Sequence, residues 1–386
     1  METKLMPSNT AAWLGAYKSP LEVKPAPYTH PAADEIVVKN HALAINPLDW
    51  ILQVAGNVAY RWLKPPLILG TDVSGEVVEI GAGVTRFKVG DRVLGMAVGT
   101  DKDSNSTARG AFQDYTVVFE RMAAPIPSTM PYENAAVLPL GVSTASCGLF
   151  QKDHLALQYP SANPTPTGRS LLVWGGSTSV GSNAIQLAVA AGYEVVTTAS
   201  PRNFDFVRKL GASQVFDYNS PTVVKDIIKA LHGKILAGAI AIGQGSADFC
   251  ADILPACTGS KFISTASGPA FQKLATRKRG SFQLPRILLK FVSSNAALQV
   301  KCRRRGIRTK FIFGSTLKNN EVSKAIYADF LPSALVDGRF VAAPDPLVVG
   351  KGLEYVQAEL ETQLKGVSAK KVVISMGGIS GYSTNP

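Results

Sequence analysis

The fold is decided by the stretch Ser170-LLVWGGSTSVGSNAIQLAVAAGYEVVTTA-Ser200. It predicts a buried strand, a glycine-rich turn, a helix and a second buried strand. Residues 171–174 are continuously apolar, as is typical of a parallel strand covered on both faces. Residues 180–191 carry small and apolar side chains at helical spacing, and Gly192 is a helix stop. A strand, turn, helix and strand within about thirty residues indicate a dinucleotide-binding unit.

The turn itself predicts a phosphate-binding site. Its glycines allow the backbone to approach a pyrophosphate, and the following helix offers its first amides and the positive end of its dipole. The spaced positions Gly175, Thr178 and Gly181 depart from G-x-G-x-x-G. A glycine-rich turn alone is often only a turn, so the surrounding strands and helix carry this prediction. The expected cofactor contacts are Gly176, Ser177, Thr178, Ser179, Val180 and Gly181.

The end of the second strand predicts which dinucleotide binds. An NAD site places Asp or Glu there for the ribose 2′-hydroxyl, whereas this chain has no acid before Asp205. A hydroxyl and a guanidinium suit a 2′-phosphate, so we expect NADPH rather than NADH. The alternatives are that Arg202 is merely solvated and that Tyr218 is a core aromatic at a strand end. The residues expected at the adenosine end are Ser200, Arg202, Asn203 and Tyr218.

Length and composition favour two domains and a cytoplasmic protein. The chain has 386 residues and 46% hydrophobic composition, enough for more than one core. We find no run of eighteen apolar residues and no secretory signal, so no membrane segment is expected. The four cysteines show no C-x-x-C spacing, which indicates buried free thiols in a reducing compartment.

The net charge of +12 comes from one region. Residues 253–320 contain fourteen Lys and Arg and no Asp or Glu. Arg277-Lys278-Arg279 and the run from Lys301 to Arg305 are dense enough to attract an acidic partner or anionic substrate. The alternative is a solvated rim. Nucleic acid is not expected as a partner, because neither interleaved aromatics nor a docking motif is present.

The chain divides near Pro139. Before it, residues 35–45, 73–81 and 91–98 predict short strands of a mostly β domain. After it, helices (140–155, 204–210 and 221–231) alternate with strands (214–217, 237–243 and 261–267), which predicts a parallel sheet. Residues 347–364 predict an amphipathic helix and 369–376 a final strand, while 268–310 resemble a substrate-side insertion. We expect a catalytic domain of residues 1–139 and 331–386 and a cofactor domain of residues 140–330.

The chain resembles the medium-chain dehydrogenases/reductases. The stretch from Gly70 to Gly95 is close to the signature of that superfamily's first domain. Within the superfamily, Ile45-NPLD-Trp50, Leu138-PLGVSTASCGL-Phe150 and Gly175-GSTSV-Gly181 are most similar to a fungal zinc-free branch. That branch holds toxD-like and CipB-like dehydrogenases and trans-acting enoyl reductases of polyketide assembly. The resemblance implies an α/β fold, with a GroES-like, mostly β catalytic domain and a Rossmann domain with a doubly wound parallel sheet.

No metal site is expected. Zinc alcohol dehydrogenases need a cysteine after the early strand and a histidine in a G-H-E motif. This chain has Asn46-Pro47 and Gly70-Thr71-Asp72 at those places. The lobe of four closely spaced cysteines is also missing, and the four histidines are widely scattered.

The resemblance also implies site residues. Thr144 would line the nicotinamide cleft and hold the substrate carbonyl or the carboxamide of the cofactor, unless it is a cap or core hydroxyl. Tyr60 is the candidate proton donor, although it is displaced by two residues from the tyrosine of mitochondrial-type enoyl thioester reductases, so solvent is the alternative donor. Further cofactor contacts are expected in an early loop (Pro47, Asp49 and Trp50), at a later strand (Ser264) and in a turn before the last strand (Ser368 and Ala369).

Loss of zinc favours conjugate reduction over simple alcohol oxidation. A metal-free site lacks a Lewis acid, whereas hydride addition to an enone or enoyl group needs only hydrogen-bond donors and a proton. The expected substrate is a free enone or an acyl thioester, the latter carried by an acidic carrier protein. The alternatives are a metal-free carbonyl or quinone reductase or alcohol dehydrogenase, and a noncatalytic NADPH-binding partner protein. Both a monomer and a homodimer are compatible with the sequence.

Overall fold

The structure is a computed structural model that describes residues 7–266 and 284–377. The chain packs into two compact units, which we describe separately. The β unit comprises Met1–Pro139, Pro346–Val367 and Lys371–Pro386, and the Rossmann unit comprises Leu140–Asp345 and Ser368–Lys370. The basic run Arg277–Arg279 and most of the expected insertion before residue 284 lie outside the described residues.

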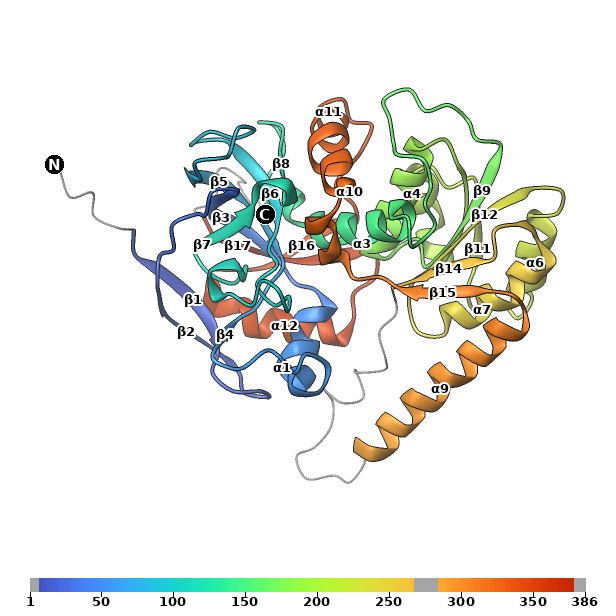
Figure 1. The fold of residues 1–386 in the computed structure, drawn as a ribbon, viewed down its shortest axis with the longest axis horizontal. Helices are drawn as coiled ribbons and strands as arrows, with labels where there is room; N and C mark the ends of the chain where they lie inside the picture. Colours follow the sequence, from blue (N-terminus) through green and yellow to red (C-terminus); the bar gives the residue numbers. More distant parts are fainter. Residues whose placement is uncertain (1–6, 267–283, 378–386) are drawn as a thin grey trace, which may run out of the picture. The chain divides into compact units, whose positions relative to one another are not determined.

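The Rossmann unit is built on a parallel sheet (Figure 1). Along its main path the strand order is β11-β10-β9-β12-β14-β15, so the order reverses between β9 and β12. Ligands of doubly wound sheets bind beyond the carboxyl ends of the strands at this reversal. The strands are β9 (Arg169–Trp174), β10 (Glu194–Ala199), β11 (Gln214–Asp217), β12 (Ile235–Ala241), β14 (Phe262–Thr265) and β15 (Arg308–Phe311), and β13 (Thr258–Gly259) pairs with β12.

Helices connect these strands and cover the sheet. One apolar core gathers residues of β9, β10 and β12 with residues of α6, α7 and α9, and Leu172, Val196 and Ile227 are fully buried in it. The helices are α3 (Pro139–Phe150), α4 (Ser179–Ala190), α5 (Phe204–Lys209), α6 (Val223–Ala230), α7 (Ser246–Ile253), α9 (Leu284–Arg304), α10 (Glu321–Ser323) and α11 (Leu331–Val336).

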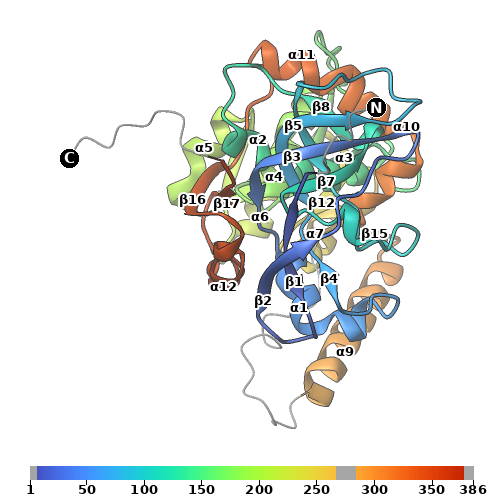
Figure 2. The ribbon, with the colours of Figure 1, turned by 90° about the vertical axis from the view of Figure 1, so that its left-hand side faces the viewer.

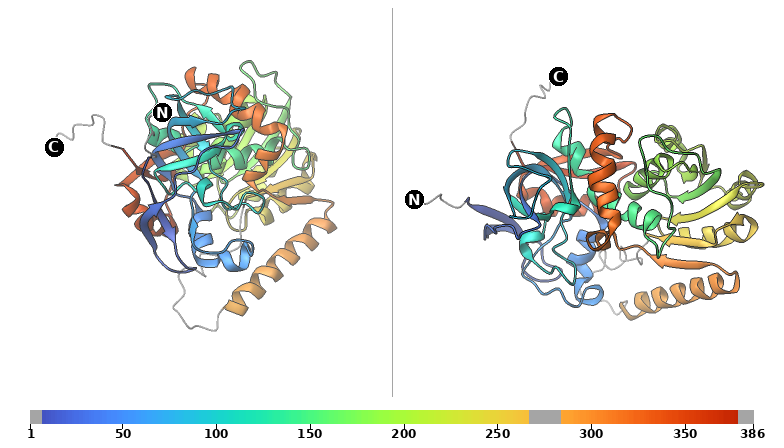
Figure 3. Two further views of the ribbon diagram at one scale, coloured as in Figure 1. Left: turned by 60° about the vertical axis from the view of Figure 1, so that its left-hand side comes forward. Right: turned by 45° about the horizontal axis from the view of Figure 1, so that its top comes forward.

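Helix α9 was not predicted from the sequence. It has 21 residues, is the long orange helix of Figure 3, and contacts α7 at its C-terminal end. Lys301 of α9 and Arg305, directly after the helix, pair with the same acid of α7: Lys301 Nζ lies 3.0 Å from Asp252 Oδ2, and the Arg305 guanidinium binds Asp252 Oδ1. Part of the basic segment is therefore neutralised within the unit, while Arg303 and Arg304 are exposed.

Residues 331–345 belong to the Rossmann unit, not to the catalytic domain as expected. The reason is continuity of the helical segment. The π-helical turn η6 (Lys324–Phe330) runs directly into α11, and the chain then returns so that the Phe340 ring meets the Phe330 ring edge to face at 6.0 Å. Phe340 is 1% exposed, which fixes the return against this unit.

The β unit contains a larger and a smaller sheet (Figure 2). The larger follows the order β16-β17-β3-β5-β6-β8 with β7 paired to β3, and the smaller follows β2-β1-β4. The strands are β1 (Asn9–Leu14), β2 (Leu21–Ala26), β3 (Glu35–Ala44), β4 (Leu67–Ile68), β5 (Asp72–Ile80), β6 (Arg92–Met96), β7 (Tyr115–Phe119), β8 (Ala123–Pro125), β16 (Asp345–Lys351) and β17 (Lys370–Ser375). The helices are α1 (Pro47–Ala59), α2 (Tyr132–Ala136) and α12 (Val356–Lys365).

The helix expected over residues 347–364 is wrong in its first half. Val348 and Val349 lie in strand β16, and α12 begins only at Val356. Two β-branched residues favour an extended backbone. Gly352, with φ of 92°, then turns the chain before the helix, which an L side chain would resist.

The described helices give no candidate for a membrane span. None in residues 7–266 or 284–377 combines the required length with sufficient apolar character.

Candidate active site

The glycine-rich turn of the Rossmann unit is tied to the end of β10. The amide of Gly175 donates to Thr198 Oγ1 at 3.0 Å, and the amide of Gly176 donates to the Thr198 carbonyl at 2.9 Å. Gly175 has φ of 89°, a conformation that favours glycine. The turn is therefore held in place by the neighbouring strand before any ligand binds.

Two glycines permit the close packing of this turn. A Cβ at Gly176 would lie 2.2 Å from Thr197 Oγ1, and one at Gly181 would lie 2.2 Å from the Gly175 carbonyl oxygen. Gly181 thus allows helix α4 to start directly against the turn. The spaced glycine pattern is explained by this steric requirement even though Thr178 replaces its middle glycine.

Thr178 caps helix α4. Its Oγ1 accepts a hydrogen bond from the Gly181 amide at 3.0 Å and donates to the Gly175 carbonyl at 2.8 Å. The amides of Ser179 and Val180, in the first helical turn, have no acceptor four residues earlier within the helix. The Ser179 hydroxyl oxygen is buried without a hydrogen-bond partner. First-turn amides and a positive helix end fit a pyrophosphate.

Polar residues gather at the expected adenosine end. Asn203 Nδ2 donates to Ser200 Oγ at 3.1 Å and to Ser368 Oγ at 3.2 Å, so two of the predicted segments meet. Arg202 is exposed, and Tyr218 is 43% exposed. Ala369 has φ of 48°, an unusual conformation for alanine that marks this turn as constrained. The cluster presents hydroxyl, amide and guanidinium groups, which suit a phosphate.

Thr144 lies in the middle of α3, not at a cap. It is 9% exposed, and a Cβ at Gly314 would lie 2.7 Å from its Oγ1. The segment after β15 therefore passes directly over this hydroxyl. Sequence reasoning missed Gly314, and the only available signal was a glycine just after a strand. The catalytic role of Thr144 stays a prediction.

Ser264 has a structural use for its hydroxyl. The Oγ donates to the Gly148 carbonyl at 2.9 Å and lies 3.1 Å from His154 Nδ1, and the residue is fully buried. These bonds tie α3 to β14. The predicted contact of Ser264 with a cofactor stays a prediction, and its hydroxyl already has partners.

In the β unit, the two places that hold metal ligands in zinc dehydrogenases are hydrogen-bonded to each other. Asn46 Nδ2 donates to Thr71 Oγ1 at 3.0 Å and to Asp72 Oδ2 at 2.8 Å. Lys371 Nζ lies 2.9 Å from Asp72 Oδ2 and donates to Asn46 Oδ1. An ammonium group thus supplies the positive charge of this buried cluster, which we call the Asn46–Lys371 network (Asn46, Asp49, Thr71, Asp72 and Lys371).

Asp49 is the second acid of the Asn46–Lys371 network. Its Oδ2 accepts a hydrogen bond from the Asn46 amide at 2.7 Å, while its Oδ1 is buried without a partner. Burial, with a smaller contribution from the Asp72 charge, raises the pKa of Asp49 to about 7. Its carboxyl is 0% exposed, so this residue faces the interior of the unit, and a direct cofactor contact stays a prediction.

The other two residues of the predicted loop differ in exposure. Pro47 is exposed at the first position of α1, where proline is well tolerated. Trp50 is 6% exposed, and its Nε1 donates to Gln363 Oε1 of α12 at 2.7 Å. The indole therefore joins α1 to α12, and its predicted cofactor contact would have to use the ring rather than this N–H.

Tyr60 follows the last turn of α1. Burial and the nearby charge of Asp101 raise the pKa of its hydroxyl. Its ring meets the Trp62 ring edge to face with centroids 5.1 Å apart. A raised pKa makes the phenol a weaker acid than an ordinary tyrosine, and its role as proton donor stays a prediction.

The described residues contain no cluster of three or more His, Cys, Asp or Glu side chains able to hold a metal ion.

A glycine-rich strand–turn–helix unit on a doubly wound sheet, joined to a GroES-like β unit, defines the class of two-domain, nicotinamide-dependent oxidoreductases. The family model described as "Alcohol dehydrogenase GroES-like domain" matches residues 32–128, and "Zinc-binding dehydrogenase" matches residues 179–254. The chain belongs to the medium-chain dehydrogenase/reductase superfamily, within a fungal branch of dehydrogenases and trans-enoyl reductases. This membership confirms the predicted family and the α/β fold with its GroES-like domain.

Two relatives and one solved structure illustrate this membership. Dehydrogenase pigH of Monascus ruber is 54% identical over 374 residues, covering 96% of this chain and 100% of the relative. Trans-enoyl reductase himH of Aspergillus japonicus is 40% identical over 373 residues, covering 95% and 97%. An alcohol dehydrogenase superfamily protein from Novosphingobium aromaticivorans shares the fold, with a TM-score of 0.70, 22% identity and coverage of 96% and 100%. The chain is thus a dehydrogenase/reductase with a nicotinamide-cofactor-binding domain.

Proposed function

We propose that this protein is a zinc-independent, NADPH-dependent reductase that delivers hydride to an activated carbon–carbon double bond in fungal secondary metabolism. The observation that carries the proposal is the Asn46–Lys371 network. At the two places where zinc relatives hold their metal, Asn46 donates a hydrogen bond to Thr71, and Asn46 and the adjacent Asp72 both bind an ammonium. Neither thiolate nor imidazole is offered to a zinc ion there.

The absence of thiolate and imidazole ligands at these two places favours alkene over carbonyl reduction. The nicotinamide, when bound, supplies the hydride. In conjugate addition, the negative charge spreads from the β-carbon to the carbonyl oxygen, where one or two hydrogen-bond donors stabilise it. The Thr144 hydroxyl, overlain by Gly314, is the donor that we assign to the substrate carbonyl. We assign the proton on the α-carbon to solvent, because Tyr60 is displaced by two residues from the tyrosine of mitochondrial-type enoyl thioester reductases.

NADPH is preferred in this proposal because of the groups around β10. Asn203 donates hydrogen bonds to both Ser200 and Ser368, and the exposed Arg202 lies in the same short segment as Ser200 and Asn203. The first acid after β10, Asp205, lies 3.2 Å from Arg208 and so pairs with a cation of its own helix. A 2′-phosphate would meet hydroxyls and a guanidinium rather than a carboxylate.

The names of two relatives point to two reactions. The himH name, trans-enoyl reductase, supports alkene reduction, whereas the pigH name, dehydrogenase, keeps carbonyl reduction as a second candidate. The test is to follow NADPH oxidation with enoyl thioesters, free enones, quinones and ketones and to identify each product by mass. A saturated carbonyl product supports the proposal, and an allylic alcohol supports the second candidate.

Two further measurements complete that test. Turnover should persist after dialysis against a chelator, and it should fall in Thr144→Val more than in Thr144→Ser, which keeps the hydroxyl. A stoichiometric metal ion required for turnover would overturn the proposal. Cofactor binding without turnover on any substrate class would instead indicate the noncatalytic partner protein.

A further inference from the structure

Strand β16 lies at an edge of the larger sheet of the β unit (Figure 2). Among the described strands it pairs only with β17, so the backbone groups on its other side, which we call the open edge of β16, face no described strand. Such an edge is a template for another strand, and proteins usually protect it by short length or by charged side chains. Strand β16 has seven residues, whereas the other strands at the edges of the described sheets have six or fewer.

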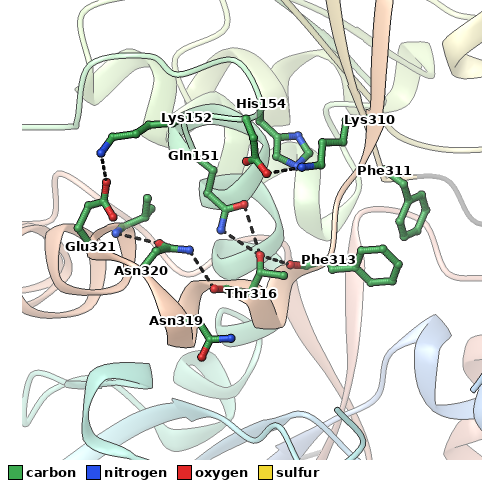
Figure 4. A pocket seen from close by; sticks show the side chains of 12 residues that line it. Gln151, Lys152, His154, Lys310, Phe311, Phe313, Thr316, Asn319, Asn320 and Glu321 are labelled. Carbon is green, nitrogen blue, oxygen red and sulfur yellow. Dashed lines mark hydrogen bonds and ion pairs between the residues drawn. The ribbon is translucent and has the colours of Figure 1, made fainter. Parts of the chain in front are cut away.

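Other edge strands carry this protection. Strand β2 contains Glu22 and Lys24 within its six residues. Strand β15 has only four residues, and two of them are the cations Arg308 and Lys310. It borders a pocket of about 390 Å³, where Lys310 already pairs with Asp153 of its own unit (Figure 4). Strand β16 differs from both, because its five inner residues carry no charge.

One hydrogen bond shows which backbone groups of β16 face its open edge. The amide of Gly352, the residue after the strand, donates to the Ser375 carbonyl of β17 at 2.9 Å. Because a trans peptide directs its N–H and C=O to opposite sides, the Lys351 carbonyl points away from β17. The direction alternates along a strand. The odd-numbered residues of 345–351 therefore face the open edge, while the even-numbered residues, Pro346 among them, face β17.

The sequence of β16, Asp345-PLVVG-Lys351, is complementary to itself in the antiparallel direction. If two copies pair about Val348, Asp345 lies opposite Lys351 of the partner subunit, and Leu347 lies opposite Val349 of the partner subunit. These residues have odd numbers, so their outward N–H and C=O groups can exchange hydrogen bonds across the pair. Opposite charges that face each other across two strands stabilise the pairing. Val348 would meet its own counterpart on the twofold axis, as an isologous contact requires.

The end charges of β16 are accessible to a partner. Asp345 Oδ2 lies 2.9 Å from Lys370 Nζ, but the Asp345 side chain is 66% exposed and can accept a second cation. Lys351 is exposed and forms no ion pair with the part of the chain that the structure describes. Pairing with a second copy would give this lysine an acid.

The side chains of β16 offer apolar surface on both faces of the sheet. Val348 and Val349 are 48% and 40% exposed, and successive side chains of a strand point to opposite faces. A Cβ at Gly350 would lie 2.3 Å from Cγ of Tyr355, so this ring, itself 47% exposed, lies against the strand. An antiparallel copy would bring Pro346 of the partner subunit opposite Gly350. These contacts would remove exposed apolar area from water.

We propose that two copies of this chain pair through the open edge of β16, antiparallel and centred on Val348, so that the larger sheets of the two β units become continuous. The partner is a second copy, because the order of charged and apolar residues in β16 matches the same sequence in the reverse direction. This pairing goes beyond the proposed function and does not depend on it.

Sedimentation velocity of the full-length protein at about 1–200 µM and low salt measures the association, and we expect a reversible dimer at the upper concentrations. Lys351→Asp puts an acid opposite Asp345 of the partner subunit and should weaken dimerisation about tenfold. Lys88→Asp is the matched control, because it makes the same charge change at an exposed lysine between β5 and β6.

The double variant Asp345→Lys/Lys351→Asp separates a broken interface from damaged folding. It restores opposite charges between the two copies, while Lys370 still meets a like charge within its own chain. Its dimerisation should therefore return to within about threefold of that of the unaltered protein. Val349→Pro removes an outward N–H, which an edge strand tolerates, and should also weaken dimerisation about tenfold while the far-UV circular dichroism stays unchanged.

Three results would each overturn the inference. The first is a protein that stays monomeric at about 200 µM, a concentration at which even a weak dimer is populated. The second is a dimer that neither Lys351→Asp nor Val349→Pro weakens, since such a dimer joins through another surface. The third is a double variant that dimerises no better than Lys351→Asp alone, because the register about Val348 would then be wrong.

Discussion

Lys371 and Asp72 form a buried ion pair in the β unit. Their Nζ and Oδ2 atoms are 2.9 Å apart, and the side chains are 5% and 0% exposed. The pair joins the last strand of the chain to the segment that opens β5. An unpaired charge left in such a place is costly, so the two residues must be treated as one structural group.

Lys371→Met should therefore destabilise the β unit by about 3–5 kcal/mol, because it leaves Asp72 buried without its ammonium. Urea unfolding followed by far-UV circular dichroism measures this change. Lys370→Met is the matched control, since the neighbouring lysine pairs with Asp345 at 2.9 Å while 43% exposed. Exposed pairs contribute about 0–1 kcal/mol. Equal losses in the two variants would contradict the assignment of a buried pair.

Asp49 should make stability depend on pH. Its folded-state pKa is about 7 against an ordinary value of 3.8, so between these values the folded protein binds more protons than the unfolded chain. The contribution of Asp49 is therefore fully present below about pH 4, falls as pH rises and is lost above about pH 7. Asp49→Asn should remove this decline. Urea unfolding midpoints of the unaltered protein and of Asp49→Asn at pH 5, 6, 7 and 8 measure this decline. Parallel pH profiles for the two proteins would refute the contribution of Asp49.

The sequence predicted the Rossmann unit well because its signals are local. Strand β9 contains a continuous apolar run, β10 is rich in β-branched residues, and the glycine-rich turn directly precedes its helix. Helix α9 was missed because prolines and glycines interrupt the segment before it. The boundary at 331 was wrong because the packing of Phe340 on Phe330 is a tertiary contact without a local signature.

The candidate site could be predicted only in part, because tertiary contacts leave no local signature in the sequence. Missing zinc ligands are visible in the residues themselves, as at Asn46 and Thr71. The group that replaces the zinc ligands is not visible in the sequence, because Lys371, which donates to Asn46, lies 325 positions away along the chain. A buried lysine in a final strand carries no signal of its partner until the sheet brings β17 beside β3, where Val373 is opposite Ala44.

Arg202→Ala should lower the affinity for NADPH about tenfold or more and leave the affinity for NADH within about twofold. The guanidinium would lose a charge-assisted bond that only the 2′-phosphate can accept. Cofactor fluorescence titration measures both constants. Arg208→Ala is the control, because that arginine is also exposed on the same segment but pairs with Asp205. A similar loss for both cofactors would argue against a 2′-phosphate site at Arg202.

Gly181→Ala should weaken both folding and cofactor binding. The new Cβ would lie 2.2 Å from the Gly175 carbonyl oxygen, a backbone atom, so α4 would have to move away from the turn. Overpacking of this kind costs about 1–3 kcal/mol. Gly15→Ala is the control, because a methyl group added there would meet no atom within 4 Å. Thermal unfolding and NADPH titration should both distinguish the two variants, and a Gly181→Ala protein with unchanged cofactor affinity would contradict the packing argument.

Tyr60→Phe should leave kcat for alkene reduction within about threefold of the unaltered protein. We assign the proton to solvent, because Tyr60 is displaced by two residues from the tyrosine of mitochondrial-type enoyl thioester reductases. A true general acid contributes about 10²–10⁴-fold to the rate, which makes the two outcomes easy to separate. The measurement is steady-state turnover. If Tyr60→Phe lowers kcat about a hundredfold, the phenol is the proton donor and the assignment of that role to solvent is wrong.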